Sequence, residues 1–224
     1  MKKIFSTIKN IIFDFGGVII DIDPNAVVNN LKDNGFTDFQ RLKEPEFVNI
    51  LNQFEKGIIR AETFRKKVCS FLNMPLNKNK FDDIWNSMLY DIPERRINLI
   101  KNLKPNYHVY LMSNSNEIHY DMFVRDLQLR FVYREFDNLF DKSFFSFDLH
   151  LMKPDPDVFT YIFDHYDLKP EETLFIDDTP ENILSAQKMG MLTYHLLRGS
   201  RVVNLFENGL LREDLDFDII HEQK

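Results

Sequence analysis

Short apolar runs alternate with amphipathic segments over most of the chain, and this alternation predicts its secondary structure. Runs of this length and composition are typical of strands that are buried on both faces of a sheet. The predicted strands are Asn10–Phe15, Tyr107–Met112, Ser143–Phe147, Thr173–Ile176 and Leu192–Leu196. Helical spacing of apolar residues predicts helices between them, over Glu94–Leu103, Glu117–Leu127, Pro156–His165 and Pro180–Met189. Strands that alternate with helices indicate an α/β fold, with a Rossmann-like, doubly wound parallel sheet and right-handed crossovers.

The stretch from about Pro24 to Pro93 breaks this alternation. It contains no convincing strand, but Gly- and Pro-containing breaks such as Asn34-Gly35 and Met74-Pro75 divide it into amphipathic segments. These segments are Asn25–Asn34, Pro45–Phe54, Ala61–Leu72 and Lys80–Leu89. We therefore predict a small helical bundle over residues 23–91, inserted after the first strand of a core that comprises residues 1–22 and 92–224. The charged residues after Leu211 have no clear assignment.

Composition narrows the class of protein. The net charge is −7 and no basic run is present, so nucleic acid is not an expected partner. The single cysteine, Cys69, cannot form an intrachain disulfide, and we expect it to pack in the interior of a protein from a reducing compartment. Lys9, Asn10 and Asp14 interrupt the apolar amino terminus, which favours a buried strand over a signal peptide. We expect a cytoplasmic protein without a membrane span, and we take a monomer as the default.

Acidic residues stand at the ends of two of the predicted strands. Asp14 comes directly after the apolar residues Ile11, Ile12 and Phe13 of the first strand, and Asp177-Asp178 follow the fourth. The carboxyl ends of parallel strands lie at one edge of the sheet, where ligands bind in open α/β sheets. Three carboxylates at that edge would repel one another unless a cation joined them, and their hard oxygen ligands suit Mg²⁺. Ser113 and Lys153, which follow the second and third strands, complete an ordered set; each residue alone is ordinary in a turn.

With these residues in their motifs, the chain resembles the haloacid dehalogenase superfamily of phosphohydrolases. The four motifs are IIFDFGG, VYLMSNSN, HLMKPDPDVF and LFIDDTPENI, and the resemblance covers nearly the whole chain, with the helical bundle as the family's cap. The sequence FDFGGVIIDID of the first motif most resembles that of a subgroup of bacterial sugar-phosphate phosphatases, the α-D-glucose-1-phosphate phosphatase-like proteins. The resemblance implies a Mg²⁺-dependent phosphatase that hydrolyses a small phosphorylated metabolite, a sugar phosphate in our expectation, through an aspartyl-phosphate.

The resemblance also implies roles for individual residues. Asp14 would be the nucleophile and, with Asp178 and the carbonyl of Gly16, a magnesium ligand. Asp177 would support the site from outside the ligand set, and Asn182 stands where many relatives carry another acid. The residues expected to bind the phosphoryl group are Gly16, Gly17, Ser113, Asn114 and Lys153.

One position departs from the family pattern. Most phosphatases of the superfamily carry a general-acid aspartate where this chain has Gly16, and such proton transfer is worth about 10²- to 10⁴-fold in rate. A leaving group of low pKa, such as an anomeric sugar hydroxyl, would suffer least from its loss. Asp21 and Asp23 are possible substitutes, although each is as readily explained as a solvent-facing acid or a helix cap.

Three other functions remain open at this point. A mutase would need the missing acid even more than a phosphatase does. A 2-haloacid dehalogenase would need no magnesium, whereas Asp177-Asp178 argue for a metal. The third function is that of a catalytically weak sensor that binds a phosphorylated ligand, and Gly16, in place of the general acid, is the only sequence feature in its favour.

Substrate choice should belong to the cap, because caps of this kind close over the site and exclude water. Phe54, Glu55, Arg60 and Trp85 are the candidates for lining the entrance. A guanidinium can hold a second anionic group, so Arg60 is the strongest of them. Phe54 and Trp85 are better explained as packing residues of the bundle.

Overall fold

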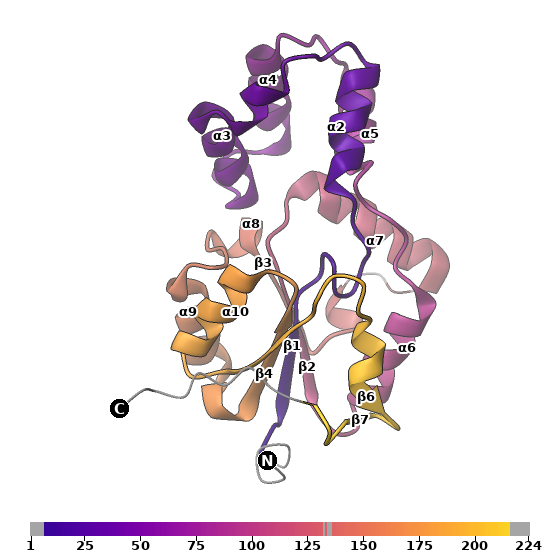
Figure 1. Cartoon of the computed structure of the whole chain (residues 1–224), viewed down its shortest axis with the longest axis vertical. Helices are drawn as coiled ribbons and strands as arrows, with labels where there is room; N and C mark the ends of the chain where they lie inside the picture. The colour runs from indigo at the N-terminus through magenta and orange to yellow at the C-terminus, as the bar shows by residue number, and fades with distance from the viewer. Residues whose placement is uncertain (1–6, 132, 134–135, 216–224) are drawn as a thin grey trace.

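The chain folds into a lobe built on a parallel sheet and a second lobe made of helices, which stands above the first in Figure 1. The computed structural model describes residues 7–131, 133 and 136–215. Among these residues, no helix combines the length and the apolar character needed to cross a lipid bilayer. The predicted cytoplasmic location stays a prediction.

Five parallel strands form the sheet, in the order β3-β2-β1-β4-β5. Their bounds are β1 Asn10–Phe13, β2 His108–Ser113, β3 Lys142–Phe145, β4 Thr173–Asp177 and β5 Leu192–His195. The central strand β1 pairs on both sides, with Asn10 opposite His108 and Thr173. This order reverses at β1, as in doubly wound sheets, and confirms the predicted α/β fold.

Alternate residues of each strand enter two different hydrophobic cores. On β1, Ile11 and Phe13 belong to the core that also contains Ile97 of α6 and Phe123 of α7, whereas Ile12 packs in the core on the other face. That other core includes residues of α9 and α10, which lie beside the sheet opposite α6 in Figure 1. The helix bounds are α6 Glu94–Leu103, α7 Glu117–Phe131, α9 Pro156–Tyr166 and α10 Pro180–Lys188. Strands covered on both faces explain the nearly continuous apolar runs.

The third strand is shorter than the sequence predicts. It ends at Phe145, and the helix α8 (Ser146–Leu149) begins where a strand to Phe147 was expected. Phe145 pairs with Ser113, the last residue of β2, so within the described residues the chain beyond Phe145 has no neighbouring strand to bond with. Pairing therefore decides this boundary, and composition does not.

A small hairpin covers one end of the sheet lobe, and the sequence pattern did not predict it. Its strands are β6 (Phe206–Glu207) and β7 (Leu210–Leu211), and Phe206 and Leu211 are buried in the core that includes α6. Residues 216–224, the end of the charged tail that had no assignment, lie outside the described residues.

The second lobe contains four α-helices with a hydrophobic core of their own, in which the rings of Phe54 and Phe64 stack with centroids 4.0 Å apart. The two connections to the sheet lobe run side by side, since the N–H of Asp23 donates to the carbonyl of Met88 over 2.8 Å. The helices are α2 Pro24–Asp33, α3 Pro45–Glu55, α4 Ala61–Leu72 and α5 Lys78–Asn86. We keep the name cap for residues 23–91, and the division of the chain at these residues stays a proposal.

Candidate active site

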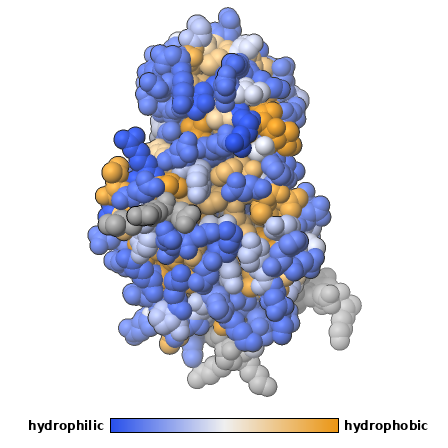
Figure 2. Space-filling model, turned by 180° about the vertical axis from the view of Figure 1, so that it is seen from behind, coloured by the Kyte–Doolittle hydropathy of each residue, from blue (hydrophilic) through white to orange (hydrophobic). Residues whose placement is uncertain are grey.

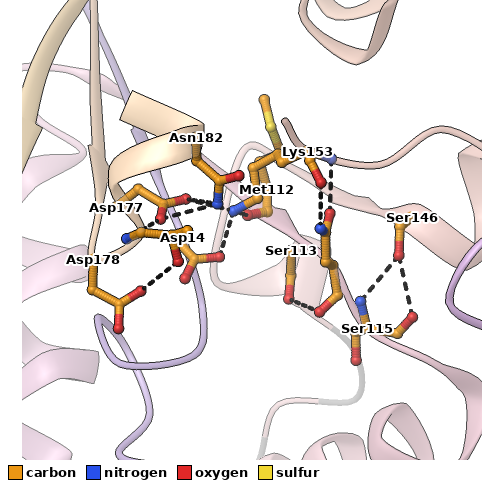
Figure 3. Close-up of polar contacts among 11 residues, drawn as sticks. Asp14, Met112, Ser113, Ser115, Ser146, Lys153, Asp177, Asp178 and Asn182 are labelled. Atoms are coloured by element: carbon orange, nitrogen blue, oxygen red, sulfur yellow. Dashed lines mark hydrogen bonds and ion pairs between the residues drawn. The ribbon is translucent and has the colours of Figure 1, made fainter. Parts of the chain in front are cut away.

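The acidic residues of the first and fourth motifs meet at the carboxyl ends of β1 and β4 (Figure 3). Asp14 follows β1 directly, Asp177 is the last residue of β4, and Asp178 comes next. Each of the three acids offers a carboxylate oxygen, and these oxygens all lie within 4.8 Å of one another. The two strands are neighbours in the sheet, which is why acids so far apart in sequence come together.

Lys153 reaches into this cluster from the loop between α8 and α9. Its Nζ donates to Asp14 Oδ1 at 2.5 Å, to Asp177 Oδ2 at 2.8 Å and to the carbonyl of Met112 at 2.9 Å. The side chain is 1% exposed, so its charge is removed from water and all three ammonium donors are bonded within the protein. A buried ammonium with this set of partners is fixed in position.

The electrostatics of the cluster follow from burial and from the mutual approach of the charges. Burial raises the pKa of Asp14 to about 7, against the attraction of Lys153. Burial also acts to lower the pKa of Lys153, but the charges of Asp14 and Asp177 outweigh it and raise that pKa. Burial and the neighbouring Asp177 raise the pKa of Asp178. A single lysine therefore lies among three acids, and a further cation would relieve the remaining repulsion between their carboxylates.

The two adjacent acids of the fourth motif have different surroundings. Asp177 is fully buried and accepts hydrogen bonds at both carboxylate oxygens, from Lys153, from the N–H of Thr179 at 2.8 Å and from Asn182 at 3.1 and 3.0 Å. Asp178 is only half-buried, and the hydroxyl of Thr179 lies 3.4 Å from its Oδ1. Asn182 therefore orients Asp177, while Asp178 keeps more capacity to bind a ligand.

Gly17 lies against the carboxylate of Asp178. Its φ is +74°, and a Cβ at this position would sit 2.1 Å from Asp178 Oδ2. Its N–H donates to the carbonyl of Ile20 at 2.8 Å, which closes the turn after β1. A side chain at residue 17 would displace Asp178, so glycine is required here both for the backbone conformation and for the space.

The second motif holds the lysine loop in place. The side-chain amide of Asn114 donates to the carbonyl of Lys153 at 2.8 Å, and its Oδ1 accepts from the N–H of Lys153 at 2.9 Å. The sequence predicts Asn114 as a phosphate donor, whereas in this structure the amide bonds the Lys153 backbone at both ends. Ser113 is buried, and its hydroxyl makes a long, 3.4 Å contact with the carbonyl of Asn114.

Some predicted site residues are bonded elsewhere. Arg60 is 82% exposed on its side chain and pairs with Glu117 of α7 at 2.7 Å. Asp21 pairs at 2.7 Å with the buried Arg96, and Asp23 caps α2 by accepting from the N–H of Asn25. Both acids considered as substitutes for the missing general acid thus have structural partners.

A groove of about 670 Å³ opens beside Asp178, and the sequence did not predict it. Gly17 and Asp178 lie on its wall together with Arg95, Arg198 and Arg201. These arginines are exposed and come from the start of α6 and from the loop after β5. Their gathering depends on two distant segments, so no local pattern signals it.

A turn of the cap rests on α8, and it carries Glu55. The Ser146 hydroxyl donates to the carbonyl of Glu55 at 2.6 Å, and His150 Nδ1 donates to the carbonyl of Lys56 at 2.7 Å. A Cβ on Gly57, whose φ is +65°, would lie 2.0 Å from the carbonyl oxygen of Phe147. Burial raises the pKa of Glu55 to about 7, so this carboxyl can hold a proton near neutral pH.

We expect Glu55→Gln to make the protein more stable than the wild type at pH 8 but not at pH 4. The folded wild type binds a proton between pH 4.5 and about 7 that the unfolded chain has lost, so its free energy of unfolding falls as pH rises through this window. The glutamine variant has no carboxyl that titrates here, so its free energy of unfolding at pH 8 exceeds that of the wild type by at most about 3 kcal/mol. Urea unfolding at both pH values measures the difference, with Glu46→Gln, on the exposed face of α3, as the control. An equal pH dependence in the wild type and Glu55→Gln would contradict the expectation.

Comparisons with known proteins agree with this geometry. A family model for haloacid dehalogenase-like hydrolases matches residues 8–190. The D-ribitol-5-phosphate phosphatase of Bacteroides thetaiotaomicron is 30% identical over 194 residues, which cover 86% of this chain and 94% of that protein. The sesquiterpene phosphatase AstK of Aspergillus oryzae is 29% identical over 195 residues, 85% of this chain and 91% of that protein.

A solved structure extends the likeness to three dimensions. It is the HAD family enzyme BT-2542 of Bacteroides thetaiotaomicron in complex with magnesium and inorganic phosphate, 33% identical to this chain, with a TM-score of 0.81. The match covers 89% of this chain and 100% of that one. The family suggested by four short motifs is thus confirmed over most of the length, in sequence and in fold. The chain belongs to the haloacid dehalogenase-like hydrolases.

Proposed function

We propose that the protein is a Mg²⁺-dependent phosphatase that hydrolyses a small sugar or polyol phosphate through an aspartyl-phosphate on Asp14. The observation that carries this proposal is the buried cluster in which Lys153 bonds both Asp14 and Asp177, with Asp178 beside them. A relative at 30% identity is a D-ribitol-5-phosphate phosphatase, which supports the substrate class.

The residues at the cluster fit a magnesium ion. They supply hard oxygen donors, their negative charge exceeds that of Lys153, and the space beside Asp178 is kept open by a glycine. Asp14, Asp178 and the carbonyl of Gly16 would hold the ion. When bound, Mg²⁺ would neutralise charge on the phosphoryl oxygens and on the carboxylates.

The reaction proceeds in two displacements. A carboxylate oxygen of Asp14 attacks phosphorus, the bond from phosphorus to the ester oxygen breaks, and that oxygen takes a proton from water and leaves as the alcohol. A second water then attacks the phosphorus of the aspartyl-phosphate and gives up a proton to solvent, the bond from phosphorus to the Asp14 oxygen breaks, and inorganic phosphate and the Asp14 carboxylate are released. Lys153 keeps Asp14 oriented throughout, and the hydroxyl of Ser113 donates to a phosphoryl oxygen. Asn114 acts on Lys153, whose backbone it bonds at both ends.

Substrates should differ in how strongly they need a proton on the leaving oxygen. Gly16 offers no acid, and Asp21 and Asp23 are engaged with Arg96 and with the start of α2. A sugar 1-phosphate, whose leaving oxygen has a low pKa, needs the proton least. A polyol phosphate needs it more, and water in the groove beside Asp178 is the proposed source for such a substrate.

Phosphate release from a panel of sugar phosphates, polyol phosphates and nucleotides, with Mg²⁺ or with EDTA, tests the function. We expect turnover that requires Mg²⁺ and that favours sugar or polyol phosphates. If the folded protein binds Mg²⁺ but releases no phosphate from any member, it is a phospho-ligand sensor instead. Release that is unchanged by EDTA would contradict the metal requirement.

We expect Gly17→Ala to weaken Mg²⁺ binding by about 10- to 100-fold, because its Cβ would lie 2.1 Å from Asp178 Oδ2. Gly35→Ala is the matched control: Gly35 also has a positive φ, +92°, but no atom of the described part of the chain lies within 4 Å of the added carbon. Both variants carry backbone strain, and only the first displaces Asp178. Isothermal titration calorimetry with Mg²⁺ measures the affinities, and equal values for the two variants would contradict the assignment of Asp178.

A further inference from the structure

The cap contains a partly open apolar pocket of about 280 Å³. Residues of all four cap helices line it, among them Val28 of α2, Leu51 of α3, Cys69 of α4 and Trp85 of α5. Figure 1 shows α2 beside α5 and α3 beside α4, so the pocket lies between two helix pairs. On the face shown in Figure 2, the cap surface is mostly hydrophilic, and hydrophobic residues gather near the level where the two lobes meet.

The lining determines what kind of molecule this pocket can hold. Among the residues that the structure describes, no charged residue and none of the proposed catalytic residues lines it. Protein interiors are normally packed to the density of organic crystals, with few voids larger than a water molecule. An apolar cavity of about 150 Å³ stays dry and binds benzene, so a volume of 280 Å³ suits about ten to twelve non-hydrogen atoms of hydrocarbon.

We infer that the cap pocket binds an uncharged hydrocarbon group of about ten carbons, at a place distinct from the phosphate site. Pro24 lines both this pocket and the groove beside Asp178. The hydrocarbon therefore has two possible sources, the apolar part of a phosphate monoester or a free apolar molecule. The ring of Trp85 also stacks on His119 of α7, with centroids 5.7 Å apart, so an occupant would contact a residue that joins the cap to the sheet lobe.

The protein contains its own reporters for this site. Trp85 is the only tryptophan and Cys69 the only cysteine in the chain, and both line the pocket. Titration with 1-decanol should change the fluorescence of Trp85 in a saturable way and slow the alkylation of Cys69 by iodoacetamide over the same concentrations. If decanol leaves both signals unchanged up to its solubility, the inference is wrong.

Two valine substitutions separate the pocket from the rest of the cap. Val28→Phe fills part of the pocket, whereas Val48→Phe adds the same atoms to an exposed position on α3. We expect Val28→Phe to weaken decanol binding by at least about tenfold, the equivalent of two lost methylene contacts, and Val48→Phe to leave it unchanged. Circular dichroism checks the fold of both. If Val28→Phe does not fold, the two wild-type signals still decide, and equal affinities in two folded variants would overturn the site.

Decyl phosphate separates the two sources. If the pocket holds the apolar part of a substrate, the enzyme hydrolyses decyl phosphate and Val28→Phe raises its KM about tenfold while that for D-ribitol 5-phosphate stays constant. If it holds a free molecule, decanol binds but decyl phosphate is not hydrolysed. The fluorescence readout does not depend on turnover, so the pocket is tested even if the proposed phosphatase activity fails.

Discussion

Asp14→Asn is expected to lower kcat/KM for the best phosphate ester by about 10⁵-fold or more, because an amide oxygen cannot replace the attacking carboxylate. The substitution keeps the shape of the side chain, which lies 2.5 Å from Lys153 in the wild type. Steady-state phosphate release in saturating Mg²⁺ measures the loss, and urea unfolding shows that the variant is folded.

The matched control for this variant is Asp83→Asn, which makes the same chemical change at an exposed position of α5. It should retain the wild-type rate. Rapid mixing with substrate, followed by an acid quench, should also trap labelled phosphate on the wild type and not on Asp14→Asn. An Asp14→Asn variant that keeps more than about one hundredth of the activity would place the nucleophile elsewhere.

The second large effect is expected for Lys153→Met, which should lower the free energy of unfolding of the metal-free protein by about 3–5 kcal/mol at pH 8. The substitution removes the ammonium that neutralises Asp14 and Asp177, which are both buried. The effect should shrink at lower pH, because burial raises the pKa of Asp14 and the variant lacks the lysine that lowers it, so this carboxyl takes up a proton and loses its buried charge. Urea denaturation at pH 8 and pH 6 measures both values.

Lys142→Met controls for the loss of a lysine, since Lys142 pairs with Asp137 at the surface and such pairs contribute at most about 1 kcal/mol. Saturating Mg²⁺ should restore part of the stability of Lys153→Met and should leave Lys142→Met unchanged. If the two lysine variants lost the same free energy, the buried cluster would not hold the site together as we describe.

Much of the fold and of the site can be predicted from local sequence. A buried parallel strand needs apolar residues on both faces, so the run Asn10–Phe15 predicts the first strand without a structure, although β1 itself ends at Phe13. An acid at the end of such a run lies at the edge of the sheet where ligands bind, so the sequence predicts that Asp14, Asp177 and Asp178 share one site, and their carboxylates do meet there. These properties belong to short segments, and a short segment carries its own signal.

Properties that depend on contacts between distant segments required the tertiary structure. Lys153 and Asp14 are 139 residues apart in the chain, and the sequence contains no sign that Asn114 bonds the backbone of Lys153. The partners of Asp21 and Arg60, the arginine-lined groove and the end of β3 at Phe145 belong to the same category.

The cap pocket illustrates the same distinction. Helical periodicity predicts that each cap helix has an apolar face, and each of the four helices does contribute apolar residues to the interior of the cap. Whether those faces close completely or leave about 280 Å³ between them depends on how side chains from four helices fit together. Local sequence thus predicts the positions of the five parallel strands, the acids at their ends and the family, because each of these is a property of a short segment. The partners of each charge and the space left for a ligand depend on side chains from distant segments, and only tertiary packing sets them.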